Sequence, residues 1–185
     1  MKRAILIHGW GSSPRMRWFH REKLRLQKLG YEVTIPKMPN KYFPNKGKWL
    51  EVLTEFAPDR GTVVIAHSLG ATMTLEYLSK TDKPVGEVFL VACPIPYTAK
   101  DSFADRIHTA LVESFILYCG YKPHEDWDTI KKNTSKIELL YKKRDFKGPQ
   151  AQGRYLADKL SCKLTVLNGN DHMNVFNLDL VNKDI

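Results

Sequence analysis

Hydrophobic residues occur along this chain in two alternating patterns. Short runs rich in β-branched residues predict strands, and longer segments with hydrophobic residues every three or four positions predict amphipathic helices. The predicted strands are residues 4–8, 31–35, 62–66, 87–92, 137–141 and 163–167. The predicted helices are residues 14–29, 49–56, 71–79 and 150–160. The alternation of strand and helix predicts a three-layer α/β fold, with helices on both faces of a mostly parallel sheet of about six strands.

Local signals set the limits of the first helix. Ser13 is followed by Pro14, and this pair is typical of a helix N-cap and first helical position. Gly30 directly follows the last hydrophobic position of the pattern, where a residue with a left-handed backbone often ends a helix. The first helix is therefore predicted to begin at Pro14 and to end at about Leu29.

The segment between the fourth and fifth predicted strands, residues 95–135, departs from the regular alternation. It is longer than one crossover helix requires. Its hydrophobic positions from Phe103 to Leu117 predict one amphipathic helix, and Trp127 and Ile130 predict a second, shorter one. Residues inserted after a parallel strand lie over the edge of the sheet where ligands bind. The segment is therefore either a helical lid or pocket wall, or a long surface crossover without a role in substrate choice.

The segment around Ser68 carries the most specific signal in the chain. Ser68 follows the predicted strand 62–66 and precedes the predicted helix 71–79, with the small residues Ala66 and Gly70 two positions away on either side. A serine between small residues at a tight strand-to-helix turn is typical of the nucleophile elbow of the α/β-hydrolase fold, usually written G-x-S-x-G. Ala66 replaces the first glycine and adds one methyl group. We interpret Ser68 as a nucleophile, and a structural serine is the alternative.

A serine hydroxyl is a weak nucleophile and requires a base. In the α/β-hydrolase fold the chain order is serine, acid, histidine. His172 follows Ser68 and lies in a glycine-containing loop just after the last predicted strand. The other histidines belong to the first-strand turn, the elbow, a helix or the inserted segment: His8, His67, His20, His108 and His124. His172 is therefore the predicted base, and an ordinary surface histidine is the alternative.

The acid that orients the base is predicted at Asp145, just after the fifth strand, and a plain turn residue is the alternative. Asp171 is a rival, but it is adjacent to the histidine in sequence, which makes the orienting geometry awkward. Asp101 and Asp105 begin the inserted helix, where the helix dipole favours a negative charge. The basic residues 142–144 favour the ionised form of Asp145, as an orienting carboxylate requires.

Two backbone N–H groups are expected to stabilise the oxyanion. The first is that of Leu69, the residue after the nucleophile. The second belongs to the loop after the first strand, most simply to Trp10. If the first and third strands are neighbours, these two loops meet at the point where the strand order reverses.

Several segments together resemble a known family. They are Ile5-Leu-Ile-His-Gly-Trp10, Met38-Pro-Asn40, Ala66-His-Ser-Leu-Gly70, Asp145 with Pro149, and Asn168-Gly-Asn-Asp-His-Met-Asn174. The chain resembles the small α/β-hydrolases of the retinoblastoma-binding serine hydrolase family over nearly its whole length, apart from the inserted segment. The resemblance implies a Ser–His–Asp triad of Ser68, His172 and Asp145 that acts on small ester or amide substrates.

Two positions depart from that family's pattern. Phe146 stands where proline usually follows the acid, and Asp171 stands where glycine usually precedes the histidine. The chain also has no L-x-C-x-E segment, and residues 160–164 match it only in part. Binding to the retinoblastoma protein is therefore not expected from the resemblance.

Length and cysteine content predict one α/β-hydrolase domain over residues 1–185 in a reducing cytoplasm. The chain has 185 residues, which are enough for a proper core. Its first hydrophobic run is too short for a signal peptide, and no run is long enough to span a bilayer. The three cysteines, Cys93, Cys119 and Cys162, are an odd number without a C-x-x-C pair.

The net charge of +9 does not by itself identify a partner. The basic residues are spread along the chain, and no nucleic-acid motif accompanies them. No metal-ligand spacing or phosphate-binding loop is present, so no cofactor is expected. We expect a small-molecule acyl substrate, and neither a nucleic acid nor a membrane as partner, while the oligomeric state is left open.

Several alternatives to a serine hydrolase remain open at this point. A binding protein on a hydrolase scaffold is one, because a fold does not fix a function. A basic protein that associates with nucleic acid is another. A Cys93 nucleophile is also conceivable, but no elbow surrounds Cys93, and we expect a small buried thiol there.

Overall fold

The computed structural model describes residues 2–96, 110, 114–122, 126–145 and 150–172. Its centre is a sheet with the strand order β2-β1-β3-β4-β5-β6, in which all neighbouring strands are parallel. The strands are β1 (Lys2–Ile7), β2 (Tyr31–Thr34), β3 (Thr62–His67), β4 (Val85–Val91), β5 (Thr134–Lys142) and β6 (Lys163–Leu167). The predicted parallel sheet is confirmed, with each strand within a few residues of its predicted limits.

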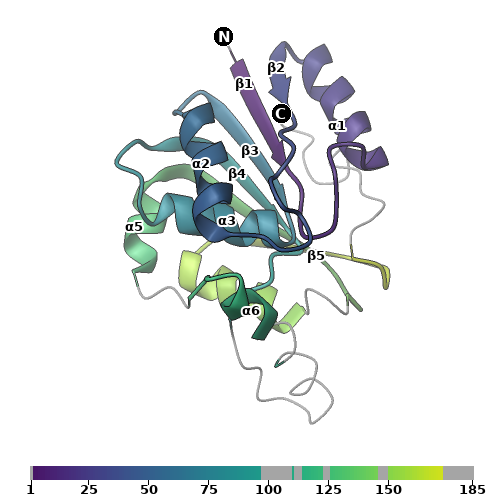
Figure 1. The fold of residues 1–185 in the computed structure, drawn as a ribbon, viewed down its shortest axis with the longest axis vertical. Helices are drawn as coiled ribbons and strands as arrows, with labels where there is room; N and C mark the ends of the chain where they lie inside the picture. The colour runs from purple at the N-terminus through teal and green to yellow at the C-terminus, as the bar shows by residue number, and fades with distance from the viewer. Residues whose placement is uncertain (1, 97–109, 111–113, 123–125, 146–149, 173–185) are drawn as a thin grey trace.

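Helices cover both faces of this sheet (Figure 1). They are α1 (Arg17–Lys28), α2 (Lys46–Phe56), α3 (Leu69–Leu78), α5 (Trp127–Lys132) and α6 (Gln150–Leu160). Residues of α1 pack in one hydrophobic cluster, whereas residues of α2, α3, α5 and α6 pack in the other. The three-layer arrangement expected from the alternation of strand and helix is therefore present.

The alternation of side chains along each strand divides the core into these two clusters. In β1, Ala4 and Leu6 pack with α1, while Ile5 and Ile7 pack on the opposite face. All four are fully buried. Strands buried on both faces read as continuous hydrophobic runs, which is why the strands were recognisable in the sequence.

The strand order reverses at β1 and β3. The chain passes from β1 to β2 on one side and returns to form β3 on the other, with Ile7 paired to Ala66 at the carboxyl ends. In open parallel sheets, ligands bind in the crevice at such a reversal point. The loops after β1 and β3 therefore meet where a site is expected.

The predicted start of the first helix is wrong. Ser13 and Pro14 belong to a turn, because the Ser13 carbonyl accepts a hydrogen bond from the Met16 N–H at 3.2 Å, and α1 begins only at Arg17 with Met16 as its N-cap. The predicted stop is confirmed, since Gly30 adopts a φ of +83°.

The predicted helix after Ser68 begins two residues earlier than expected, at Leu69. The shorter helix predicted around Trp127 and Ile130 is α5. Most of the predicted helix from Phe103 to Leu117 lies outside the described residues, although residues 114–118 are helical. The role of the inserted segment 95–135 stays a prediction.

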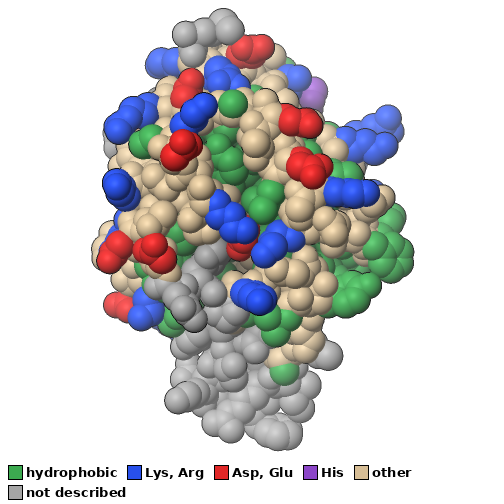
Figure 2. Space-filling model, turned by 60° about the vertical axis from the view of Figure 1, so that its left-hand side comes forward, with side chains coloured by type: hydrophobic (Ala, Val, Ile, Leu, Met, Phe, Trp, Pro, Cys, Tyr) green, Lys and Arg blue, Asp and Glu red, His purple; other side chains and the backbone are tan. Residues whose placement is uncertain are grey.

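Basic and acidic side chains share the face shown in Figure 2. Lysine and arginine side chains are spread over this face with aspartate and glutamate among them, in keeping with the scatter of basic residues along the chain. None of the helices within the described residues combines the length and the hydrophobicity that a membrane span requires.

Candidate active site

Ser68 lies at a sharp turn between β3 and α3. Its φ of 54° and ψ of −130° place a non-glycine residue in a region that L-amino acids rarely adopt. Its N–H donates a hydrogen bond to the Val91 carbonyl at 2.9 Å, and its own carbonyl accepts from Ala71 at 2.8 Å. These bonds hold the strained backbone in place. The local geometry is that expected of a nucleophile elbow.

Two glycines allow the backbone to pass this turn. A Cβ added at Gly70 would lie 2.7 Å from the His8 carbonyl oxygen and 2.8 Å from that of Ile7. A Cβ added at Gly9 would lie 2.6 Å from the Ser68 Cβ and 3.1 Å from its Oγ. The loop after β1 is therefore in direct contact with Ser68. The sequence pattern indicated the requirement at Gly70, but it did not indicate that at Gly9.

His172 joins Ser68 to Asp145 in one chain of hydrogen bonds. His172 Nε2 lies 2.8 Å from Ser68 Oγ, and Nδ1 lies 2.9 and 2.8 Å from the two carboxylate oxygens of Asp145. Because a carboxylate only accepts, Nδ1 carries the proton, and Nε2 of the neutral ring accepts from the Ser68 hydroxyl. The structure therefore brings together the three residues singled out in the sequence.

Each of the three side chains comes from the carboxyl edge of the sheet. Ser68 follows β3, Asp145 lies three residues after β5, and His172 lies five residues after β6. The Asp145 side chain has 0% exposed surface and the His172 side chain has 11%. Burial of the carboxylate limits competition from water for Nδ1, while the imidazole keeps a small exposed surface.

His67 contributes a contact that the sequence did not reveal. Its Nε2 lies 2.9 Å from the backbone carbonyl of His172, so the ring donates to that oxygen. The His67 ring also contacts the Trp18 ring at 5.8 Å, between centroids. His67 therefore connects the loop that carries His172 to the end of β3 and to α1.

Lys142 and Asp171 form an ion pair beside the same loop. Lys142 is buried, with 7% of its surface exposed, and it is the last residue of β5. Lys143 and Arg144 are exposed. The predicted basic group 142–144 is thus divided, because Lys142 binds a carboxylate across 29 residues of sequence whereas its two neighbours face solvent.

The two predicted oxyanion donors belong to the two loops that meet at Ser68. Leu69 is the first residue of α3, and Trp10 follows Gly9, which contacts Ser68. Within the described residues, neither backbone N–H donates a hydrogen bond to a protein acceptor. The Leu69 N–H belongs to the first turn of a helix, where such groups have no partner in the helix itself.

His8 holds the loop after β1 through two hydrogen bonds of its ring. Its Nδ1–H donates to the Gly9 carbonyl at 2.9 Å, and its Nε2 accepts from the Met38 N–H at 3.2 Å. The bond from Met38 requires the neutral ring, because Nε2 can accept only when it carries no proton. Burial lowers the pKa of His8, and Lys41 adds to this by repulsion, although the bond to Gly9 opposes it. The neutral imidazole therefore connects the Gly9 loop to the loop after β2.

Aromatic side chains lie beside the loop after β1. The Trp10 indole N–H donates to the Tyr42 carbonyl at 3.0 Å, and its ring contacts Phe115 with 5.0 Å between centroids. Trp10 is 47% exposed and Tyr42 is 59% exposed. An adjoining hollow of about 810 Å³ is lined by residues 37–43. Exposed aromatic rings and this hollow thus adjoin the predicted oxyanion loop.

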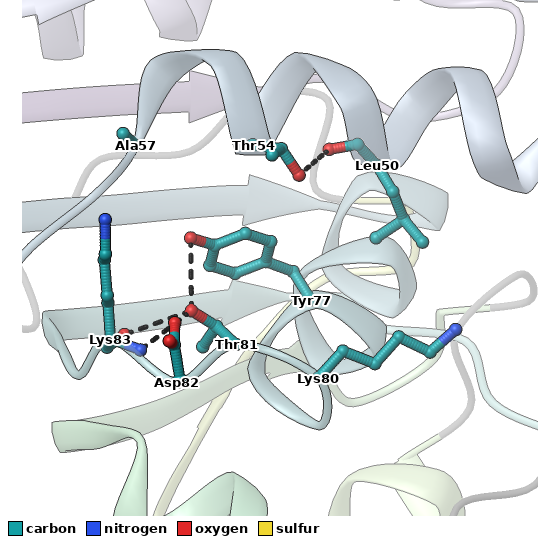
Figure 3. A pocket seen from close by; sticks show the side chains of 8 residues that line it. All are labelled: Leu50, Thr54, Ala57, Tyr77, Lys80, Thr81, Asp82 and Lys83. Carbon is teal, nitrogen blue, oxygen red and sulfur yellow. Dashed lines mark hydrogen bonds between the residues drawn. The ribbon is translucent and has the colours of Figure 1, made fainter.

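A separate pocket of about 300 Å³ lies away from Ser68 (Figure 3). Its lining residues are Leu50, Thr54, Ala57, Tyr77, Lys80, Thr81, Asp82 and Lys83. Tyr77 is near the C-terminus of α3, whereas Ser68 is its N-cap, and a helix rises about 1.5 Å per residue. The pocket therefore lies at the opposite end of this helix from the hydrogen-bonded Ser68.

Neither a metal site nor a cysteine nucleophile emerges from the described residues. Within them, no group of three or more His, Cys, Asp or Glu side chains could hold a metal ion. Cys93 is fully buried, and burial raises the pKa of its thiol to about 12. Such a thiol is almost wholly protonated at neutral pH and is a poor nucleophile. The small buried thiol expected at this position is confirmed.

A family model described as "Serine hydrolase" matches residues 4–115 of the chain, which include the loop after β1 and the Ser68 turn. The chain belongs to the serine hydrolase family. The protein YdeN of Bacillus subtilis (strain 168), which is named as a hydrolase, is 33% identical over 95 residues. That match covers 49% of this serine hydrolase family member and 50% of YdeN, or about half of each chain.

Solved structures share the fold of this serine hydrolase family member. The structure of YdeN has a TM-score of 0.77 at 23% identity and covers 93% of this chain and 88% of its own. Est1E from Butyrivibrio proteoclasticus has a TM-score of 0.71 at 15% identity, with coverages of 97% and 83%. The esterase EaEST from Exiguobacterium antarcticum has a TM-score of 0.67 at 14% identity, with coverages of 94% and 85%. The chain therefore has the α/β-hydrolase fold.

Proposed function

We propose that this protein hydrolyses an ester, thioester or amide bond of a small acyl substrate through a triad of Ser68, His172 and Asp145. The observation that supports this most directly is the continuous hydrogen-bond chain, with 2.8 Å between Ser68 Oγ and His172 Nε2 and 2.8 to 2.9 Å between Nδ1 and Asp145. A protein that only binds a ligand has no need for these three groups in this order and geometry. The resemblance to the retinoblastoma-binding serine hydrolases agrees with the proposal.

The first half of the reaction forms an acyl-enzyme. Ser68 Oγ attacks the substrate carbonyl carbon while its proton passes to Nε2 of His172. Asp145 keeps the other ring proton on Nδ1 and stabilises the imidazolium. The imidazolium then gives the Nε2 proton to the leaving group as its bond to the carbonyl carbon breaks. The acyl group remains on Ser68.

In the second half of the reaction, a water molecule acts as the nucleophile and releases the acyl group. His172 Nε2 takes a proton from a water molecule as its oxygen attacks the acyl carbon. The proton then returns to Ser68 Oγ, and the free acid leaves. In both halves the N–H groups of Trp10 and Leu69 would donate to the oxygen that becomes negative, a contribution of about 10²–10³ in rate per donor in other serine hydrolases.

The surroundings of the proposed triad favour a substrate with an apolar part. The exposed rings of Trp10 and Tyr42, together with the hollow lined by residues 37–43, adjoin the proposed oxyanion loop. The structural neighbour EaEST is described as an esterase, which makes a carboxylic ester the first class to test. A simple activated ester such as p-nitrophenyl acetate is therefore a suitable probe.

Labelling with a fluorophosphonate, followed by peptide mapping, tests the proposal. We expect one adduct on Ser68, which is absent from Ser68→Ala and strongly reduced in His172→Ala. The matched control is Ser79→Ala at the other end of α3, where the hydroxyl donates to the Glu76 carbonyl. This control should be labelled like the unaltered protein. A folded protein without an adduct would contradict the triad and favour a binding protein on a hydrolase scaffold.

A further inference from the structure

We propose that the ion pair between Lys142 and Asp171 is a positioning pair that holds His172 in register with Asp145 and balances the charge beside its imidazole. This inference rests on the proposed function, because it assigns a role in the same site. Neither residue is placed in contact with the substrate. Both act through His172.

The pair connects the two segments that carry the proposed acid and base. Lys142 ends β5 and lies three residues before Asp145, while Asp171 directly precedes His172. The Lys142 side chain is 9% exposed and that of Asp171 is 36% exposed. A partly buried ion pair is less screened by salt than a pair on the surface. It therefore resists movement of the His172 loop away from β5.

The loop before His172 is built around the Lys142 side chain. A Cβ added at Gly169 would lie 2.8 Å from Lys142 Cδ and 3.2 Å from Cε, and Gly169 has a φ of +140°. The Arg144 N–H donates to the Gly169 carbonyl at 3.1 Å, and the Lys143 N–H donates to the Leu167 carbonyl at 2.9 Å. The loop thus closes over the lysine stem, and the ion pair lies at the end of this closed segment.

Charge gives the pair a second role that packing alone does not supply. Among the described residues, the ionisable groups near this loop are Asp145 after β5, His67 at the end of β3, Lys142 with Asp171, and the exposed Lys143 and Arg144. Asp171 adds a second carboxylate next to the histidine, and Lys142 compensates its charge. A carboxylate left uncompensated would stabilise the imidazolium, whereas an ammonium left uncompensated would destabilise it.

The two single substitutions therefore have opposite electrostatic effects. Lys142→Met keeps most of the stem against Gly169 but leaves Asp171 uncompensated, so the acidic limb of the kcat/KM profile should move to higher pH. Asp171→Asn leaves the ammonium uncompensated, so the limb should move to lower pH. The double variant should return the limb close to its original position. Both single variants should also lower kcat by roughly 10- to 100-fold through misplacement of His172, with little change in KM.

The experiment measures pH profiles with p-nitrophenyl acetate, thermal unfolding, and the titration of the His172 ring by NMR. The control is Lys163→Met, which removes an ion pair to Glu138 between β5 and β6, at the end of this strand pair away from Lys142. It should leave the limb and the ring titration unchanged. Opposite shifts in the two single variants support the inference, and no shift or shifts of the same sign overturn it.

The NMR measurement separates the two proposals. If the unaltered protein neither hydrolyses the ester nor reacts with a fluorophosphonate, the proposed function fails. The ring titration still shows whether Lys142 and Asp171 set the charge environment of His172. If the protein is active but the variants keep the original kcat, limb and titration, the positioning pair alone is wrong.

Discussion

Asp145 decides which nitrogen of His172 carries a proton. Both of its oxygens lie within 2.9 Å of Nδ1, and its side chain has no exposed surface. Asparagine has nearly the same shape, but its amide group can donate to Nδ1 and so favour the tautomer with the proton on Nε2. That tautomer cannot accept the Ser68 proton.

Asp145→Asn should therefore lower kcat for p-nitrophenyl acetate by about 10³- to 10⁴-fold, with a smaller change in KM. The control is Asp128→Asn on α5, where the carboxylate is 91% exposed and pairs with Lys131. This control should keep its full kcat. A fall of less than tenfold in the Asp145 variant would remove Asp145 from the proposed mechanism.

His8 should make stability depend on pH. Its pKa is lowered in the folded protein, mainly by burial, so the unfolded chain binds a proton at this residue more readily. Stability from His8 is then complete above the unfolded pKa of about 6.5 and is lost as the pH falls toward the lower folded value. Urea unfolding at pH 7.5 and 5.5 should show a smaller difference between the two pH values for His8→Gln than for the unaltered protein.

The matched control for that measurement is His20→Gln, on the exposed side of α1. Its difference between the two pH values should equal that of the unaltered protein. An unchanged pH dependence in His8→Gln would mean that the His8 ring is not held neutral. The hydrogen bonds to Gly9 and Met38 would then need another explanation.

At the scale of elements, the connection between β3 and α3 depends on the absence of a side chain at position 70. Gly70→Ala would place a Cβ 2.7 Å from a backbone carbonyl of the loop after β1. Because backbone cannot rotate away as a side chain can, this loop and the Ser68 turn must separate. We expect a fall of about 1–3 kcal/mol in the free energy of unfolding, together with at least a tenfold loss of kcat.

Gly61→Ala is the control at the other end of the same strand. A Cβ there meets only the Asp59 side chain, at the ordinary contact distance of 3.4 Å. Urea unfolding and ester hydrolysis should therefore be nearly unchanged in Gly61→Ala. An active and equally stable Gly70→Ala variant would show that the turn tolerates a methyl group at position 70 as it does at position 66.

The order of elements explains how much of this site was predictable. Ser68, Asp145 and His172 each follow a strand, and the carboxyl ends of parallel strands meet at one edge, so their proximity followed from the pattern. The Lys142–Asp171 pair and the His67 bond to His172 join residues 29 and 105 positions apart. No local pattern encodes such pairings, because they depend on the final path of the loops.

The same reasoning applies to errors in the limits of elements. Ser13 and Pro14 have the composition of a helix start, yet a hydrogen bond from Met16 to Ser13 closes a turn there. The signal for a cap residue is local, whereas the choice between a turn and a helix depends on where Trp18 and Phe19 must pack against the sheet. Tertiary packing thus shifted the start of α1 without altering its existence or its core-facing side.

At the scale of the whole molecule, the net charge of +9 should influence the approach of charged substrates. Asp171 compensates Lys142, but Lys143 and Arg144 remain exposed and line a hollow of about 290 Å³ with residues 168–170, which shortly precede His172 in the sequence. The kcat/KM for an ester with a carboxylate group should therefore fall as salt rises, because the Debye length is about 10 Å at 0.1 M and 3 Å at 1 M.

A neutral ester of the same size should show little salt dependence of kcat/KM. The double variant Lys143→Gln, Arg144→Gln should weaken the salt dependence for the anionic ester.

The control Lys131→Gln changes the net charge on α5, where that lysine pairs with Asp128. If the steering arises from the whole molecule, this control reduces the salt dependence as much per charge as the variant near the site. If it arises locally, only the changes at residues 143 and 144 reduce it. Equal salt dependence for the two esters would exclude steering altogether.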